Sequence, residues 1–369
     1  MKNLYKDSVV FVLADMGGGG AQNVSHNVMN YWAANGKNVA LITMAPVSED
    51  KFPIHPAITR HVIGGIIPST NLISRLFNNI KRIIQLRKVL KLYSGYTILS
   101  FIAPMNILTI LATVGFKCRR VISERNDPAK QSFGKFWDYL RTKLYPCADV
   151  VTANSQGALE TLSSYVPYSK LGYLPNPLRH SFPHHPVSRD QKIILTVGRL
   201  HQQKAHDVLI RAFSHVADKK EDWHLMIVGE GPEREMLTEL ISQLRLETRI
   251  TLCGFQENVT EYYKKASIFA LPSRYEGTPN VLLEALSYGI PSIASDAIPS
   301  IESLIEDKVS GAIIPCNNER EWAFTLLRFI ENHNKLDGMA FQARQTAQRY
   351  TLDNVIHDWN KYIFPDSFR

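Results

Sequence analysis

The sequence predicts an α/β protein built from two successive doubly wound domains. Short apolar strands, each followed by a turn and a helical stretch, alternate along almost all of the 369 residues, which is typical of parallel sheets covered by helices. A polar segment rich in proline and histidine interrupts the alternation at about 180–190, as expected of a linker. We therefore expect a first domain over 1–180 and a second over 185–350, with ligands in a cleft at the strand carboxyl ends.

Each domain contains five clear strand signals. The predicted strands lie at 9–14, 38–43, 97–101, 120–124 and 149–154, and then at 192–198, 224–229, 249–254, 267–272 and 290–296. A helix is predicted at 21–35 and another over the tail, 340–364. Residues 98–114 carry no charge, but Pro104 and Asn106 divide them, which favours a strand and a buried helix over a membrane span.

The stretch "SRYEGTPNVLLEALSYG" places two glutamates, Glu276 and Glu284, eight positions apart. Thr278 is a capping residue type and Pro279 suits a first helical turn, while Gly289 is a stop signal, so a helix is predicted from about 279 to 288. A helix N-terminus is an anion site. Glu276 then precedes that site, and apolar neighbours favour a buried Glu284 over a solvated one.

Charge is distributed unevenly along the chain. Residues 1–180 hold 21 basic and 9 acidic residues, whereas 181–369 hold 21 and 25. No acid occurs between Asp50 and Glu124, a segment with 11 basic residues. Such a segment suits a polyanionic partner, and without a recognised nucleic-acid motif we favour an anionic membrane surface.

Within that segment, residues 71–84 predict a basic amphipathic helix. An apolar stripe is expected on one side, and Arg75, Lys81 and Arg82 are expected off it, where they could contact the membrane. The alternative is a core-packed helix with a solvated basic face. The stripe consists of Leu72, Ile73, Leu76, Phe77, Ile80, Ile83 and Ile84.

Two loops at strand ends suit phosphate groups. Four glycines, Gly17 to Gly20, follow the first strand and open a helix, so backbone amides can approach an anion there. Gln22 stands where a dinucleotide fingerprint requires its third glycine. Arg199 and Lys204 follow the strand at 192–198 and suit a diphosphate, although two solvated cations would look the same.

No metal or cofactor is expected. The four cysteines are scattered without metal-ligand spacing, and no D-x-D pair occurs, so a carboxylate-held metal is not indicated. A nucleotide diphosphate neutralised by protein cations and helix dipoles is the implied ligand.

These motifs together resemble the retaining family 4 glycosyltransferases, which have the GT-B fold of two Rossmann-like domains facing a cleft. The resemblance rests on E-x7-E in "EGTPNVLLE", on "GRLHQQK", on "GGAQ", and on "LPNPL" and "ANS" at 174–178 and 153–155. It covers nearly the whole chain. It also implies that a C-terminal helix at about 351–369 packs back onto the first domain.

The resemblance implies a role for each matched residue. Arg199 and Lys204 would hold the donor diphosphate, Glu284 the ribose hydroxyls, and Glu276 the sugar hydroxyls near the reacting centre. Further donor contacts would come from Gly19, Gly20, Gly277, Thr278, Asn280 and Val281.

The chain departs from the family pattern at two places. Ala205 follows Lys204 where the family usually has glycine, and "ISERNDP" has Arg125 where many members have a histidine. An arginine cannot act as a base near neutral pH. Glu124 and Arg125 therefore remain catalytic candidates without assigned roles, and a local ion pair between them is the alternative.

We expect a retaining hexosyltransferase. It would move a hexose or N-acetylhexosamine from a UDP-linked nucleotide-sugar, which is a substrate and not a cofactor, to a saccharide on a polyprenyl diphosphate. The product would belong to bacterial surface polysaccharide assembly such as O-antigen, capsule or exopolysaccharide. The enzyme would be cytoplasmic and peripheral on the inner face of the cytoplasmic membrane, with no nucleic-acid partner. A GT-B-like UDP-sugar epimerase and a non-catalytic nucleotide-sugar-binding module are the alternatives.

Overall fold

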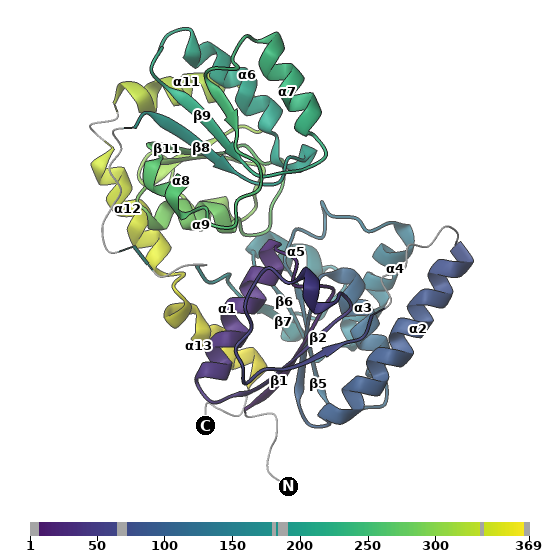
Figure 1. Ribbon diagram of the computed structural model, residues 1–369. Helices are drawn as coiled ribbons and strands as arrows, with labels where there is room; N and C mark the ends of the chain where they lie inside the picture. Colours follow the sequence, from purple (N-terminus) through teal and green to yellow (C-terminus); the bar gives the residue numbers. More distant parts are fainter. Residues whose placement is uncertain (1–6, 65–71, 179–181, 184–190, 333–335, 365–369) are drawn as a thin grey trace. The chain divides into compact units, whose positions relative to one another are not determined.

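The computed structural model describes residues 7–64, 72–178, 182–183, 191–332 and 336–364, with the side chains of 72–76 excepted. The chain divides into two compact units (Figure 1). Unit 1 comprises residues 1–179 and 352–369, and unit 2 comprises 180–351.

Unit 1 is built on a parallel sheet with helices on both faces. Its strands run in the order β3-β2-β1-β4-β5-β6-β7, so the strand order reverses between β1 and β4. All the pairings are parallel. The strands are β1 (Ser8–Leu13), β2 (Asn38–Thr43), β3 (Thr59–Val62), β4 (Thr97–Phe101), β5 (Arg119–Glu124), β6 (Val150–Ala153) and β7 (Leu171–Tyr173).

The helices of unit 1 cover the sheet because alternate strand residues face opposite sides. Val9 and Phe11 of β1 pack with the first and the last helix, whereas Val10 and Val12 pack with helices on the other face. The helices are α1 (Gly20–Ala34), α2 (Leu72–Leu90), α3 (Ala103–Ala112), α4 (Lys135–Leu144), α5 (Gln156–Ser163) and α13 (Leu352–Ile363).

Unit 2 repeats this construction. Its sheet has the order β10-β9-β8-β11-β12-β13, again fully parallel, and reverses between β8 and β11. The strands are β8 (Ile193–Val197), β9 (His224–Val228), β10 (Ile250–Leu252), β11 (Ile268–Leu271), β12 (Ser292–Ser295) and β13 (Gly311–Ile314). The helices are α6 (His206–Ala217), α7 (Arg234–Gln243), α8 (Thr260–Lys265), α9 (Asn280–Ser287), α10 (Ile301–Leu304), α11 (Glu319–Glu331) and α12 (Asp337–Gln348).

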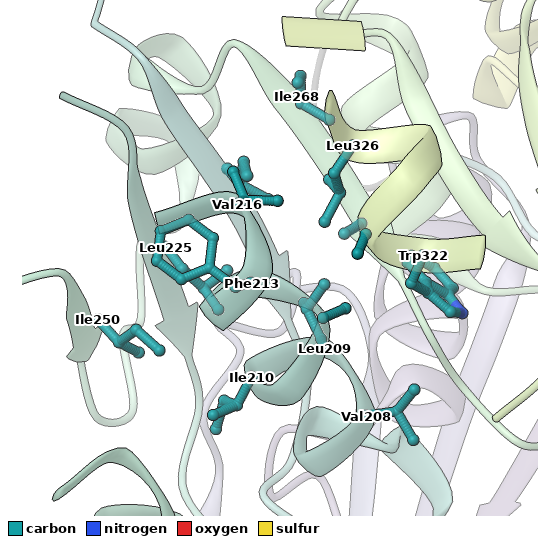
Figure 2. Close-up of a cluster of buried hydrophobic side chains, with 14 of the residues drawn as sticks. Val208, Leu209, Ile210, Phe213, Val216, Leu225, Ile250, Ile268, Trp322 and Leu326 are labelled. Carbon is teal, nitrogen blue, oxygen red and sulfur yellow. The ribbon is translucent and has the colours of Figure 1, made fainter. Parts of the chain in front are cut away.

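The core of unit 2 fixes the strands that carry its loops. Figure 2 shows Phe213 and Val216 of α6 beside Leu225 of β9, with Trp322 and Leu326 of α11 on the other side of α6. These side chains are almost fully buried. Burial of each such side chain stabilises the folded state by about 1.5–3 kcal/mol. The strands that carry the loops at the carboxyl edge are therefore held rigidly in place.

The structure confirms the predicted pair of parallel α/β folds and the strand-then-helix reading of 98–114, which forms β4 and α3. The tail, predicted as one helix, is two. Tight turns at Arg349, Tyr350 and Thr351, whose amides bond three residues back, end α12 before α13 begins. Where the chain is described, no helix combines the length and apolar character that crossing a membrane requires.

Candidate functional site

The candidate site lies at the carboxyl edge of the unit 2 sheet, where the strand order reverses between β8 and β11. The loop after β8 carries Arg199 and Lys204, and the loop after β11 carries Glu276. Ligands of open parallel sheets bind at such reversal points, because the loops on either side diverge there. The fold thus brings motifs from distant parts of the sequence to one edge.

Glu276 and Lys204 contact each other directly. The Lys204 ammonium and Glu276 Oε1 form an ion pair between residues 72 positions apart. Ser273 also donates a hydrogen bond to Glu276 Oε1, at 2.9 Å. The stem of Lys204 packs so closely on Gly198 that a Cβ there would lie 3.1 Å from Lys204 Cδ. Both charged groups are therefore held in place, by a contact that no local sequence pattern predicts.

Glu284 is the second carboxylate of the motif, and it is buried. It lies on α9, only 4% exposed. The hydroxyl of Tyr263, from α8, donates to Glu284 Oε2 at 2.9 Å. The Tyr263 ring in turn stacks on Tyr288, with ring centroids 5.5 Å apart. The expectation of a buried Glu284 is confirmed, and the tyrosine fixes its orientation.

The turn before α9 differs slightly from its prediction. The helix covers 280–287 instead of 279–288, because Pro279 adopts an extended backbone and occupies the N-cap position. Thr278 is therefore not the cap, and no side chain caps the helix. Gly277 and Thr278 are buried, and the Gly277 carbonyl accepts a hydrogen bond from Ser300 Oγ at 2.6 Å. Asn280 and Val281, the first two helical residues, are half-buried.

The two cations after β8, Arg199 and Lys204, differ in their exposure and ion pairing. Arg199 is exposed and forms no ion pair within the described ranges, whereas Lys204 is paired with Glu276. Ala205 has left-handed backbone angles, φ 51° and ψ 39°. A side chain costs about 1–2 kcal/mol there, which explains why the resembled family usually has glycine at this position.

Three further residues of this edge, Arg274, Asp207 and His206, were not predicted from the sequence. Arg274 forms an ion pair with Asp207. His206 is fully buried, next to the backbone of Gly198 and Arg199. Burial, and then the charge of Lys204, lowers the pKa of His206 to about 4. Their proximity to Lys204 and Glu276 in the sequence was the only available signal.

In unit 1 the glycine-rich loop follows β1, beside the strand reversal. Asp15 Oδ1 accepts hydrogen bonds from the Gly17 amide at 2.8 Å and from Gln22 Nε2 at 3.0 Å. Gly19 is the N-cap of α1, and Gly20 begins the helix. A Cβ on Gly19 would lie 2.4 Å from Gln22 Oε1, so this loop is compact as well as glycine-rich.

Glu124 ends β5 inside a buried polar network. The Tyr145 hydroxyl donates a hydrogen bond to Glu124 Oε1. Asn106 Nδ2 donates to the same hydroxyl oxygen at 3.0 Å. Burial raises the pKa of Glu124 to about 7, against the opposing effects of Tyr145 and two arginines.

Arg125 has different partners from its neighbour. Its Nη1 donates to the Leu174 carbonyl and to Asn176 Oδ1, each at 3.1 Å. Its guanidinium lies 4.5 Å from the Phe101 ring centroid and 4.7 Å from that of Trp359. In the described part of the chain no ion pair joins Glu124 to Arg125. Arg125 thus links α13 to the body of unit 1 through Nη1 and its ring contacts, whereas its Nε and Nη2 are buried without a hydrogen-bond partner where the structure is described.

The predicted apolar stripe of α2 is divided between two faces. Ile83 and Leu86 pack on the core of unit 1, whereas Phe77, Ile80 and Ile84 are 67%, 47% and 59% exposed. The stripe read from the sequence therefore does not all face one side, because the sheet covers only part of the helix surface.

The three predicted membrane-contact cations also lie on α2. Lys81 is exposed. Arg82 is half-buried and donates to Asn79 Oδ1 at 3.0 Å. The side chain of Arg75 lies outside the described part of the structure. Lys81 thus stands beside the exposed apolar residues of this helix.

No group of His, Cys, Asp or Glu side chains suited to a metal ion occurs in the described parts of either unit. The charged groups at the unit 2 edge are instead the Lys204 ammonium, two guanidiniums and carboxylates. Such a set suits a ligand carrying both anionic and hydroxyl groups.

Family models match both halves of the chain. Residues 18–182 match the model described as Glycosyltransferase Family 4, and residues 179–346 match the model described as Glycosyl transferases group 1. The first match covers most of the sequence-continuous part of unit 1, and the second covers nearly all of unit 2.

Relatives match over almost the full length. An uncharacterized glycosyltransferase of Haemophilus influenzae is 27% identical over 366 residues, covering 95% of this chain and 97% of the relative. A Campylobacter jejuni protein is 28% identical over 354 residues, covering 89% of this chain and 96% of that protein. It is named N-acetylgalactosamine-N,N'-diacetylbacillosaminyl-diphospho-undecaprenol 4-alpha-N-acetylgalactosaminyltransferase.

The fold also matches solved structures. Anabaena HepE, crystallised in complex with UDP, superimposes with a TM-score of 0.80 at 18% identity, over 96% of this chain and 98% of that one. Together with the family matches, this likeness confirms the predicted GT-B fold class.

Proposed function

Because the chain belongs to the glycosyltransferases with the GT-B fold, we propose that it is a retaining hexosyltransferase using a nucleotide diphosphate sugar. The observation that carries this proposal is the Lys204–Glu276 pair at the reversal point of the unit 2 sheet. It puts a cation for a diphosphate beside a carboxylate that can accept hydrogen bonds from sugar hydroxyls.

Each residue of this edge receives a role in the proposal. Lys204 and the exposed Arg199 neutralise the diphosphate, and Glu276 holds the sugar next to the bond that breaks. Glu284, oriented by Tyr263, accepts hydrogen bonds from the ribose hydroxyls. The turn of Gly277, Thr278, Asn280 and Val281 lies at the N-terminus of α9, whose dipole favours an anion. In unit 1 the loop of Gly19 and Gly20 presents backbone amides to a phosphate group.

The transfer requires no strong protein base in this proposal. The bond between the anomeric carbon and the diphosphate oxygen breaks, and the acceptor oxygen bonds to that carbon on the same face. The acceptor proton passes to the departing diphosphate. The protein stabilises the negative charge that develops on the leaving group, chiefly through Lys204 and Arg199. We assign Glu124 and Arg125 no part in this step, because Tyr145 donates to Glu124 and Arg125 Nη1 donates to the Leu174 carbonyl within unit 1.

The proposed acceptor is a saccharide on a polyprenyl diphosphate, and the proposed donor is UDP-linked. The Campylobacter relative named above acts, by its name, on a diphospho-undecaprenol substrate, and the HepE structure holds UDP. Both likenesses support the proposal. A role in bacterial surface polysaccharide synthesis follows from such an acceptor.

An acceptor of this kind requires contact with a membrane, and we propose α2 for it. Phe77, Ile80 and Ile84 are exposed beside Lys81, and an apolar face flanked by cations suits an anionic bilayer. The enzyme is then peripheral on the cytoplasmic side of the cytoplasmic membrane, where nucleotide-sugars and lipid-linked acceptors meet.

Product analysis with a panel of UDP-sugars tests the function. The purified chain is incubated with each sugar, with and without a polyprenyl-diphosphate saccharide. We expect a glycosylated lipid and UDP, formed only when acceptor is present, with the anomeric configuration of the donor kept. A product sugar formed without acceptor would instead identify an epimerase, and binding without any product would identify a binding module. Activity should persist in EDTA if no metal takes part.

A further inference from the structure

Arg274 joins three loops at the carboxyl edge of the unit 2 sheet. It stands two residues before Glu276, and its Nη1 donates to the Gln202 carbonyl at 2.5 Å, in the loop after β8. Its Nε donates to Asn317 Oδ1 at 2.9 Å, in the loop after β13. Its Nη2 donates to both carboxylate oxygens of Asp207, at 3.0 and 3.3 Å.

Two further hydrogen bonds join the same pair of loops. The Arg274 amide donates to the Gln203 carbonyl at 2.8 Å. The Gln203 side-chain amide in turn donates to the Tyr275 carbonyl at 2.9 Å. Gln202 and Gln203 immediately precede Lys204, so the bonds surround the point where the ion pair with Glu276 forms.

We propose that Arg274 is a positioning residue: it holds the loops of Lys204 and Glu276 together so that the two side chains meet. Asp207 in turn orients the Arg274 guanidinium. The proposal rests on the proposed function, since Lys204 is taken to bind the donor diphosphate. The planar guanidinium can reach a carbonyl, an amide oxygen and a carboxylate at once, in fixed directions. Lysine would keep the charge but could not make this fork of contacts.

A direct contact between Arg274 and the donor phosphates is the competing explanation, and Asp207 separates the two. If Arg274 bound phosphate itself, removing the charge of Asp207 would free the guanidinium and strengthen binding. If Arg274 acts by positioning, removing that charge loosens the loop and weakens binding. The two explanations predict opposite signs for the same substitution.

Calorimetric titration of UDP into the wild type and five variants tests the proposal. We expect Arg274→Lys to raise the Kd about tenfold to a hundredfold, as for a lost charged hydrogen bond, and Asp207→Asn to raise it by a smaller factor. In a Lys204→Ala background, Arg274→Lys should add little, because it acts through the absent ammonium. The matched control is Arg211→Lys, at an exposed α6 arginine 3.7 Å from Glu319, which should leave the Kd unchanged.

A Kd that stays equal or falls in Asp207→Asn overturns the proposal, as does full additivity of Arg274→Lys with Lys204→Ala. Thermal melting of each variant shows that it is folded before titration.

Hydrogen exchange separates this proposal from the proposed function. Absence of UDP binding to the wild type would contradict the UDP-linked donor. The positioning role of Arg274 would then be tested by amide hydrogen exchange alone. Without any ligand, the amides of residues 201–207 should exchange faster in Arg274→Lys than in Arg211→Lys, because the loop has lost its anchor. Equal exchange in the two variants overturns the positioning role.

Discussion

Charged residues at the carboxyl edges of the two sheets differ in their partners. In unit 2, Lys204 and Glu276 come from different loops and contact each other at the edge. In unit 1, Glu124 and Arg125 are neighbours in the sequence but have different partners within the unit. Glu124 accepts a hydrogen bond from Tyr145, and Arg125 donates to the Leu174 carbonyl. From the sequence alone, a charged residue at a strand end can belong either to a ligand site or to the internal structure of the domain. A charged partner from a second loop at a strand reversal favours a ligand site, whereas aromatic and backbone partners favour a structural role.

The largest effect should come from Glu276→Gln. We expect turnover to fall about tenfold to a thousandfold, the range for losing one positioned polar group near developing charge. Glu124→Gln, the matched change in unit 1, should lower turnover less than tenfold, because the amide can still accept the Tyr145 hydrogen bond. Steady-state rates with saturating donor and acceptor measure both. Equal losses in the two variants would remove the distinction between the edges.

A second test concerns α2. Changing Arg75, Lys81 and Arg82 together to Gln should weaken liposome binding, by about 1 kcal/mol per cation near an anionic surface. Transfer to a lipid-linked acceptor should slow, whereas transfer to a short soluble analogue should stay near wild type. Co-sedimentation with anionic and neutral liposomes measures the binding, and high salt should mimic the variant.

The control for this test removes the same net charge from unit 2. Arg211, Lys220 and Lys264 lie in surface ion pairs, and changing them together to Gln should not alter sedimentation. If both triple variants sediment alike, or if the α2 variant loses both activities equally, α2 is an ordinary solvated surface.

A third test addresses Arg125. Arg125→Leu should lower the free energy of unfolding by about 2–3 kcal/mol, because two charged hydrogen bonds and the contacts with Phe101 and Trp359 are lost. The Kd for UDP should not change, because Arg125 has no proposed contact with the nucleotide and the two proposed diphosphate cations, Arg199 and Lys204, belong to unit 2. Urea denaturation and calorimetry measure the two quantities. A stable variant with weakened UDP binding would return Arg125 to the ligand site.

A last effect is a pH dependence of stability. Because the folded pKa of Glu124 is raised to about 7 from an ordinary value of 4.5, the folded state holds its proton more tightly than the unfolded state. Its contribution to stability is therefore present below pH 4.5 and is lost as the pH rises through about 7. His206 has the opposite sign: its pKa is lowered to about 4, so stability is lost as the pH falls from 6.5 toward 4.

Urea denaturation at a series of pH values measures the Glu124 effect. Glu124→Gln should flatten the decline in stability between pH 4.5 and 7, and it should exceed the wild type in stability above pH 7. Parallel curves for the wild type and the variant would show that Glu124 does not titrate in this range.

Much of the fold could be predicted from the sequence, because periodicity and turn residues are local signals. The strand-turn-helix alternation predicted ten of the thirteen strands described and missed the short edge strands β3, β7 and β13. Gly289, at φ 70°, ends α9 as expected. Those strand ends also placed Arg199, Lys204 and Glu276 at one edge, since carboxyl ends of parallel strands share an edge.

The contacts within that edge could not be predicted in the same way. The Lys204–Glu276 pair spans 72 positions, and no local pattern encodes a contact at that distance. The two-faced character of α2 depends on how much of its surface the sheet of unit 1 covers. The direction of Arg125 depends on where Trp359 of α13 returns to that unit.

Titration of UDP and uridine into the wild type and Lys204→Ala tests most directly whether Lys204 binds the donor diphosphate. We predict that the variant binds UDP about tenfold to a hundredfold more weakly, as Arg199→Ala also should, while its affinity for uridine, which lacks the phosphates, stays at the wild-type value. An unchanged Kd for UDP in Lys204→Ala, or an equal loss for UDP and uridine, would contradict the account.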